Sequence, residues 1–464
     1  MRIERPPVAH DAPILLHARR LPLLLTLVLL PARAHGSEGA DFGASLPLYS
    51  VAPFAVMLLA IAILPLATPH WWERLRSKLL VSILLAIPVG LYIVRGDAPE
   101  LVRVLHEYAA FICLLGSLFV ISGGILLTGD LRATPRVNTL FLLCGAAVAN
   151  LVGTTGASML LIRPLLRTNE ERRNVLHIPV FFIFLVSNIG GCLTPLGDPP
   201  LFLGFLRGVP FTWTLQLWRP WVLTTSLLLA LFFFIDTAQI RKETRLADIL
   251  DRIRVEPLRI QGGTNFLAFL GVLALVIWAP TPWREIGMAA LAFASYLFTP
   301  KRIHQRNHFT LYPIQEVAIL FVGIFVTMIP ALLLLEARGA ELGVHDPQHY
   351  FWATGLLSSF LDNAPTYLTF TSMALGSLHL PGEVAKPLAA LVLDPEGHRI
   401  LTAISLGAVF MGANSYIGNG PNFMVKSICE ERGLRMPSFF GYMIWSVGIL
   451  IPVFAIVSWF FLRS

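Results

Sequence analysis

The sequence predicts an all-α polytopic membrane protein built from two halves of opposite orientation, an inverted-topology repeat. Hydrophobic residues make up 55% of the 464 positions, charged residues make up only 14%, and the mean hydropathy is +0.70. A soluble protein of ordinary composition carries about 25% charged residues. Apolar runs of membrane-spanning length follow one another along the chain. Two of these runs, one in each half, contain polar interruptions rich in proline and glycine.

The net charge of +7 does not indicate a nucleic-acid partner, because the basic residues lie in short loops between apolar spans, where charge marks orientation. The four cysteines show no paired spacing, so we expect free thiols and no zinc site. His106-Glu107 lacks the second histidine of a zinc-protease motif, and no phosphate-binding loop is evident. We therefore expect a protein that is not an enzyme and not an ATP-driven pump.

The first interruption is SNIGGCLTPLGDPPLF, Ser187 to Phe202, inside an apolar run. A helix cannot run intact through Pro195, Pro199 and Pro200, since proline removes a backbone donor and clashes one turn back. Non-helical backbone survives at membrane depth only where protein or a water-filled cavity covers it. We therefore predict a broken helix whose loop exposes free backbone groups and Asp198 to a cavity, as in the binding sites of secondary transporters.

A second stretch, MGANSYIGNGPNF at Met411 to Phe423, matches the first when the sequence is shifted by 221 positions. The pairs that this shift aligns are Gly191 with Gly412, Thr194 with Ser415, Gly197 with Gly418, Asp198 with Asn419, Pro200 with Pro421, and Phe202 with Phe423. Two such loops, each inside an apolar span, indicate an internal duplication.

Residues 1–36 are expected to form a signal or targeting segment. Arg19 and Arg20 precede the apolar run Leu21–Leu30, and Ala32 to Ala34 resembles a small-residue cleavage site. The run is too short to cross a bilayer. An uncleaved segment or a mis-assigned start codon is the alternative. In each case we expect the residues that follow to be periplasmic.

The first transporter repeat is predicted over residues 47–235. Its spans are expected at 51–67, 79–94, 107–127, 178–206 (broken) and 220–235. Between them, NLVGTTGAS at Asn150 to Ser158 interrupts the apolar stretch 138–162, and arginines flank that stretch on both sides. Basic loops at both ends indicate a re-entrant hairpin that enters from the cytoplasm.

A basic cytoplasmic linker, residues 236–263, leads to the second repeat, residues 264–464. Here spans are expected at 264–280, 285–299, 312–335, 399–425 (broken) and 438–461, with a second hairpin at 351–375 centred on Asp362-Asn363-Ala364-Pro365-Thr366. Lys and Arg are concentrated in the loops that this arrangement places inside. An odd number of crossings separates equivalent elements, so the halves have opposite orientation.

Three motifs resemble the ion transporter superfamily: SNIGG at Ser187 to Gly191, TPLGD at Thr194 to Asp198, and DNAP at Asp362 to Pro365. The superfamily includes NhaD-type sodium/proton antiporters, arsenite permeases, citrate transporters and divalent anion/sodium symporters. The first two motifs are similar to the NhaD-type pattern, although Gly197 to Pro200 reads GDPP where an NhaD-type protein has GDVT. The second broken helix is more similar to proteins labelled citrate transporters (the CitMHS-like group) or sodium/proton antiporters.

The resemblance implies two related sodium sites, made by hairpin tips and broken-helix loops, and also implies that a homodimer can form. Carried over by position, site one would use Thr154, Thr155, Ser187, Asn188 and Asp198, with Thr194 in the same loop. Site two would use Asp362, Asn363, Thr366, Asn414, Ser415 and Asn419.

The residue types fit sodium, a hard cation that prefers carboxylate, hydroxyl, amide and backbone oxygens. Asp198 and Asp362 are the leading candidates, because a carboxylate at membrane depth costs about 2.5–3.5 kcal/mol and is functional by default. Desolvation penalises the charged form, so such a group could exchange a proton for sodium. The alternative for both residues is capping of helix ends at the break. Glu107 and Glu316, which begin the third span of each half, could carry protons or could be interfacial side chains that reach water.

The break regions contain acidic side chains and no Lys or Arg, which favours a cation as substrate. The leading hypothesis is therefore a sodium/proton antiporter of the bacterial inner membrane, working by alternating access. The alternative is a sodium- or proton-coupled symporter of citrate or a dicarboxylate, whose positive field could come from helix N-termini and bound sodium. Expected partners are sodium, protons, the lipid bilayer and, for the symporter, a small carboxylate. No cofactor is expected, and no metal besides sodium.

Overall fold

The computed structural model describes residues 38–243, 255–380 and 386–463, and this part of the chain is predominantly helical. Six of its helical segments are long and apolar enough to cross a membrane. The predicted all-α polytopic membrane fold is confirmed. The proposed targeting segment, residues 1–36, and part of the basic linker lie outside the described residues.

The first half follows the predicted order of elements. It consists of α2 (Glu38–Ser45), η2 (Leu48–Val51), α3 (Ala52–Ala67), α4 (Pro69–Trp72), α5 (Leu75–Gly123), β1 (Leu126–Asp130), α6 (Pro135–Thr168), α7 (His177–Leu185), η3 (Ile189–Leu193), α8 (Pro199–Leu206), η4 (Phe211–Leu217) and α9 (Trp218–Ile240).

The second half begins with β2 (Glu256–Gln261). It continues with α11 (Asn265–Trp278), α12 (Trp283–Phe298), α13 (Lys301–Arg306), α14 (Tyr312–Thr327), α15 (Ile329–Arg338), η5 (Gly339–Leu342), α16 (Pro347–Phe360), α17 (Asn363–Ser377), α18 (Ala389–Leu393), α19 (Pro395–Met411), η6 (Gly412–Asn414), α20 (Gly420–Glu431) and α21 (Phe439–Phe461).

The spans predicted at 79–94 and 107–127 are two parts of one helical element, α5, joined at a kink instead of a loop. Asp97 leaves the helical conformation, with φ −149° and ψ 75°. Its Oδ1 accepts a hydrogen bond from the backbone N–H of Glu100 at 3.1 Å, and Pro99 lies in the first turn that follows. Asp97 therefore caps the second part of α5, where proline is also tolerated because its missing N–H needs no partner.

A short antiparallel sheet was not predicted. The third span was expected to reach residue 127, but α5 ends at Gly123 and β1 begins at Leu126. Leu126 pairs with Gln261 and Thr128 with Arg259, so β2 lies within the stretch expected to be only a basic linker. The sheet thus ties the end of α5 to the start of the second half.

Both predicted hairpins fold back on themselves. A straight α-helix of 34 residues, the length of α6, would be about 51 Å long. Yet Asn138, near its start, donates to Oδ1 of Asn169, just after its end, at 2.9 Å. The reversal occurs at Gly153, whose φ of +78° and ψ of 155° suit a glycine. In the second half, the hydroxyls of Tyr350 on α16 and Ser377 on α17 lie 2.9 Å apart.

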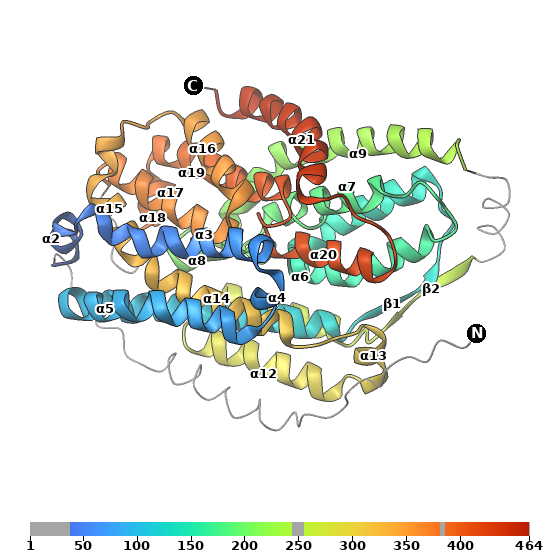
Figure 1. Cartoon of the computed structure of the whole chain (residues 1–464), viewed down its shortest axis with the longest axis horizontal. Coiled ribbons are helices and arrows are strands. Elements are labelled where there is room, and N and C mark those ends of the chain that lie inside the picture. Colours follow the sequence, from blue (N-terminus) through green and yellow to red (C-terminus); the bar gives the residue numbers. More distant parts are fainter. Residues whose placement is uncertain (1–37, 244–254, 381–385, 464) are drawn as a thin grey trace.

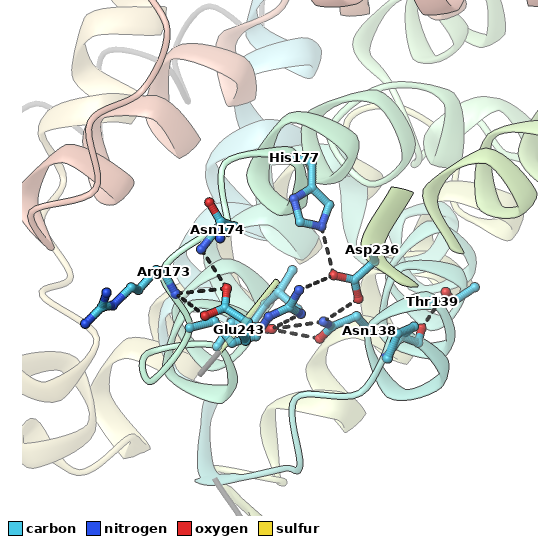
Figure 2. A network of polar contacts seen from close by, with 11 residues as sticks. Asn138, Thr139, Arg173, Asn174, His177, Asp236 and Glu243 are labelled. Atoms are coloured by element: carbon cyan, nitrogen blue, oxygen red, sulfur yellow. Dashed lines mark hydrogen bonds and ion pairs between the residues drawn. The ribbon is translucent and has the colours of Figure 1, made fainter. Parts of the chain in front are cut away.

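A buried polar network closes the base of the first hairpin (Figure 2). Asp236 on α9 is fully buried; its Oδ1 lies 2.6 Å from a guanidinium nitrogen of Arg172 and 2.8 Å from Nε2 of His177. Its Oδ2 accepts from Asn138 at 3.0 Å. Removing one partner of such a buried pair is strongly destabilising, so the network fixes the ends of α6, α7 and α9 relative to one another.

The two halves pack into each other (Figure 1). α14 runs alongside α5, α8 packs against α17 of the second hairpin, and α20 packs against α6 of the first hairpin. The second segment of each broken helix thus contacts the hairpin of the other half. This exchange brings loops that are distant in the sequence to one place.

The two broken-helix loops have the same local conformation. Asp198 and Asn419, which each precede a helix, have φ/ψ of −142°/142° and −155°/141°. A Cβ on Gly197 would lie 2.1 Å from the carbonyl oxygen of Gly191, and a Cβ on Gly418 would lie 2.6 Å from that of Gly412. In each loop the backbone crosses itself so closely that only glycine fits. The 221-position shift therefore aligns matching backbone geometry as well as matching residues.

We predict that Gly418→Ala lowers the stability of the folded protein, because its Cβ would also meet the Ser358 carbonyl oxygen at 2.7 Å. Overpacking of this kind costs about 1–3 kcal/mol. The measurement is the apparent unfolding temperature of the purified protein in detergent. Gly420→Ala, two positions along the same loop, is the matched control, because nothing lies within 4 Å of its added Cβ. Equal unfolding temperatures for the two variants would contradict the crossed-backbone geometry.

Candidate functional site

The two broken-helix loops meet through three buried asparagines. Asn188 Nδ2 donates to Asn422 Oδ1 at 2.7 Å. Asn419 Nδ2 lies 3.2 Å from Asn188 Oδ1 and 3.3 Å from the carbonyl oxygen of Ser187. All three asparagine side chains are buried. Buried amides need partners, and these amides find them across the boundary between the two halves.

Asp198 is the only charged side chain among these contacts, and it is 1% exposed. Its Oδ1 accepts from Thr154 Oγ1 at 3.0 Å and from Asn419 Nδ2 at 3.1 Å. Its Oδ2 accepts from Asn363 Nδ2 at 2.5 Å. One carboxylate therefore joins the first hairpin, the second hairpin and both broken helices. The structure unites residues that the resemblance assigned to two separate sodium sites.

The charge of Asp198 has no basic partner among these contacts, because all three donors are neutral. Hydrogen bonds stabilise a buried carboxylate but leave its net charge in place. A buried charge that is not paired is costly, and a bound cation or a proton would remove that cost.

Among the predicted site residues, two buried amide oxygens have no hydrogen-bond partner within the described part of the chain: Asn363 Oδ1 and Asn414 Oδ1. Both asparagines use Nδ2 as a donor, Asn363 to Asp198 and Asn414 to Ser359 Oγ at 2.8 Å. An unsatisfied buried acceptor costs about 1–3 kcal/mol, and amide oxygens are ligands that hard cations accept. Asn363 Oδ1 belongs to a side chain that is bonded to Asp198, so it is a candidate ligand for a cation at that carboxylate.

Asp362 fits the capping interpretation more closely than Asp198 does. Its Oδ1 accepts from the backbone N–H of Ala364 at 3.1 Å, at the start of α17. The Thr366 hydroxyl donates to the Asp362 carbonyl oxygen at 3.0 Å, within the same helix. Asp198 also precedes a helix, α8, but its side chain caps no N–H there. The two aspartates that the sequence treated alike thus make different contacts.

The loop hydroxyls Thr194 and Ser415, aligned by the repeat, make equivalent bonds to the hairpins. Thr194 Oγ1 donates to the Asn150 carbonyl oxygen, and Ser415 Oγ donates to the Ser359 carbonyl oxygen, each at 2.5 Å. These two side chains fix the position of each loop on the hairpin of its own half.

A small cavity of about 60 Å³ opens beside the tip of the first hairpin. Thr154, Thr155, Gly197 and Pro199 line it, together with apolar residues of α5 and α14. A water molecule needs about 10–15 Å³ of such volume, whereas sites for drug-sized ligands measure about 300–1,000 Å³. The cavity therefore has room for a few water molecules or a partly hydrated ion, and it is too small for an organic anion.

Glu107 and Glu316, the candidate proton carriers, both form ion pairs. Glu107 lies 2.5 Å from a guanidinium nitrogen of Arg103 and 2.9 Å from one of Arg207. Glu316 lies 2.7 Å from Nζ of Lys78, whose side chain is 3% exposed. Lys78 and Arg207 approach these glutamates from other elements, which the spacing along the chain does not show, whereas Arg103 lies one turn before Glu107 on the same helix.

Several residues of this region were not among the predicted site residues. The Ser187 hydroxyl lies 2.8 Å from that of Ser158, and Ser359 accepts from Asn414. Asn422 was expected either to satisfy freed backbone groups or to contact the ion. It donates to the Gly412 and Ser415 carbonyl oxygens and also accepts from Asn188. Ser158 and Ser359 both lie within the interrupted hairpins, so their position was the available signal.

Comparison with known families identifies a relationship over nearly the whole chain. A family model described as "Putative citrate transport" matches residues 43–462. The match therefore includes both hairpins and both broken helices. A comparison with curated proteins found no match.

We predict that the effects of Asn188→Ala and Asn422→Ala on stability are coupled. The two asparagine side chains form a hydrogen bond that joins the two halves. Side chains in contact show interaction energies of about 0.5–3 kcal/mol. The unfolding temperatures of the two single variants and the double variant measure this coupling. Asn307, which bonds to the Gly123 and Ile125 carbonyl oxygens, provides the control: Asn307→Ala should add independently to Asn188→Ala. Simple additivity of Asn188→Ala and Asn422→Ala would refute the contact.

Proposed function

Since the chain belongs to the family described as citrate transport, we infer that it is a secondary active transporter of citrate or a chemically similar carboxylate. The observation that carries this inference is the extent of the match, which includes every element of both halves from α3 to α21. The family is one of transport rather than of catalysis. This assignment favours the symporter that the sequence left as the alternative.

We further propose that sodium is a coupling ion and binds at Asp198. Citrate is an anion, so carrying it into a negatively charged cell interior requires co-transported positive charge. The neutral donors around Asp198 leave one negative charge for a cation to balance, and Asn363, which is bonded to Asp198, offers a free amide oxygen. The N-termini of α8 and α20 begin directly after Asp198 and Asn419, and helix N-termini favour anions. A sodium ion at Asp198 and a carboxylate group of the substrate at the helix N-termini could thus occupy adjacent positions.

Alternating access would follow from opposite orientation of residues 47–235 and 264–464 in an inner membrane, with the start of the first repeat on the periplasmic side. The matching order of elements and the matching loop geometry support this arrangement. The small cavity at the first hairpin is consistent with a conformation that is closed to the organic substrate. Binding of citrate would then require a second conformation in which the site opens.

Sodium/proton antiport is the second candidate function. The observation that favours it is the absence of a basic partner for Asp198 among the described contacts, which suits exchange between sodium and a proton at one carboxylate. An antiporter would need no carboxylate substrate, and this difference separates the two functions experimentally.

We predict that purified protein in proteoliposomes takes up labelled citrate when an inward sodium gradient is imposed. Sodium gradients and proton gradients should be imposed separately, with potassium replacing sodium as the control. The absence of citrate uptake under every gradient would contradict the transport proposal. If sodium flux instead moved the internal pH with no citrate present, antiport would be the function.

A further inference from the structure

A cluster of buried and half-buried charged side chains lies apart from the Asp198 contacts, at the end of broken helix α8. It contains Glu100, Arg103 and Glu107 on α5, Arg207 immediately after α8, and Glu336 on α15. Three carboxylates and two guanidinium groups leave one negative charge in excess when all are ionised.

Ion pairs account for two of the three carboxylates. Arg103 lies 2.5 Å from Glu100 Oε1 and 2.5 Å from Glu107 Oε1. Arg207 donates twice to Glu107 Oε2, from Nε at 3.0 Å and from Nη2 at 2.9 Å. These two carboxylates balance the two guanidinium groups. Glu336 is the carboxylate that remains without a balancing charge.

Glu336 is bonded to a neutral group although a basic group is near. Its Oε1 accepts a hydrogen bond from the Ser372 hydroxyl on α17 at 2.9 Å. Within the described residues this is the one hydrogen bond recorded for the Glu336 side chain. Arg207 is 1% exposed, and its Nη1 has no hydrogen-bond partner there. The charged groups acting on Glu336 are Arg207, Arg103 and Glu100. Farther along the chain, Arg338 and Glu341 pair with each other.

We propose that Glu336 is a proton-binding site, and that its proton controls whether α15 is tied to the broken helix through Arg207. With the proton bound, the cluster is neutral, Ser372 holds the carboxyl group, and Arg207 Nη1 stays free, as in this structure. On release of the proton, the ionised carboxylate is attracted to Nη1, and a new ion pair joins α15 to the end of α8. The proposal rests on the transport function and adds a proton site distinct from Asp198.

The position of Arg207 couples the protonation state of Glu336 to the proposed transport site. Arg207 is the C-cap of α8, and Asp198 is the N-cap of the same eight-residue helix. A short helix moves as a unit, so an ion pair at one end constrains the loop at the other. The cavity beside that loop would therefore respond to the protonation state of Glu336.

Infrared difference spectroscopy of the full-length protein in lipid, between acidic and alkaline buffer, tests the site without any transported solute. We expect a protonated-carboxyl band in the wild type that is lost in Glu336→Gln. Ser372→Ala, which keeps the carboxyl group but removes its hydrogen bond, should shift this band and thus show that the protein still folds. Glu341→Gln, at an exposed position in η5 just after α15, should leave it unchanged. A Glu336→Gln spectrum identical to that of the wild type would overturn the proposal.

Transport gives a second readout. Glu336→Gln should lose the acceleration of citrate uptake by an inward proton gradient while retaining citrate–citrate exchange. Acceleration equal to that of the wild type would count against the proton site. If the wild type moves no citrate, the transport proposal fails, and the infrared result still decides whether Glu336 binds a proton.

Discussion

The arrangement of this protein depends on a single buried carboxylate, Asp198, that has no basic partner among its contacts. Placing a carboxylate at membrane depth costs about 2.5–3.5 kcal/mol, while a hydrogen bond to a charged group contributes about 1.5–3 kcal/mol. Three such bonds can hold the group in place. They come from both hairpins and from the opposite broken helix, so burying this charge requires the two halves to be assembled.

The backbone of the two loops makes that assembly possible. Each broken helix crosses itself at a pair of glycines, and each loop is bonded to its own hairpin by one hydroxyl, Thr194 or Ser415. With each loop fixed on its own hairpin, the asparagines can reach across to the other half. The base of the first hairpin is held separately by Asp236 and its partners.

The sequence was sufficient to predict most of the helical elements. Proline and glycine positions located both broken helices and both hairpins, and hydropathy located the spans, because these are local properties of the chain. The kink at Asp97 was missed because a loop was expected between the two spans. A single aspartate that caps the following turn connects them instead. The β1–β2 sheet was missed because strand pairing between residues more than a hundred positions apart has no local signal.

The composition of the site was only partly predictable. Asp198, Asn188, Asn363 and Asn419 were selected as polar residues in broken segments, yet their division into two sites does not match the contacts. Sequence alignment of the halves pairs equivalent residues but does not show that a residue of one half bonds to the other half. The ion pairs of Glu107 with Arg207 and of Glu316 with Lys78 depend on packing between elements in the same way. The family match supports the resemblance to citrate transporters. It does not specifically support the sodium/proton antiporter that the sequence favoured.

We propose that sodium binds at Asp198 because the charge of this carboxylate has no basic partner among its contacts. The most direct measurement is the unfolding temperature of wild-type protein and of Asp198→Asn, as sodium replaces choline at constant ionic strength and pH. Binding to the folded state adds about 2.7 kcal/mol at a ligand concentration 100 times the dissociation constant. The account predicts a sodium-dependent rise for the wild type and none for Asp198→Asn. An equal rise in both proteins, or no rise in the wild type, would contradict it.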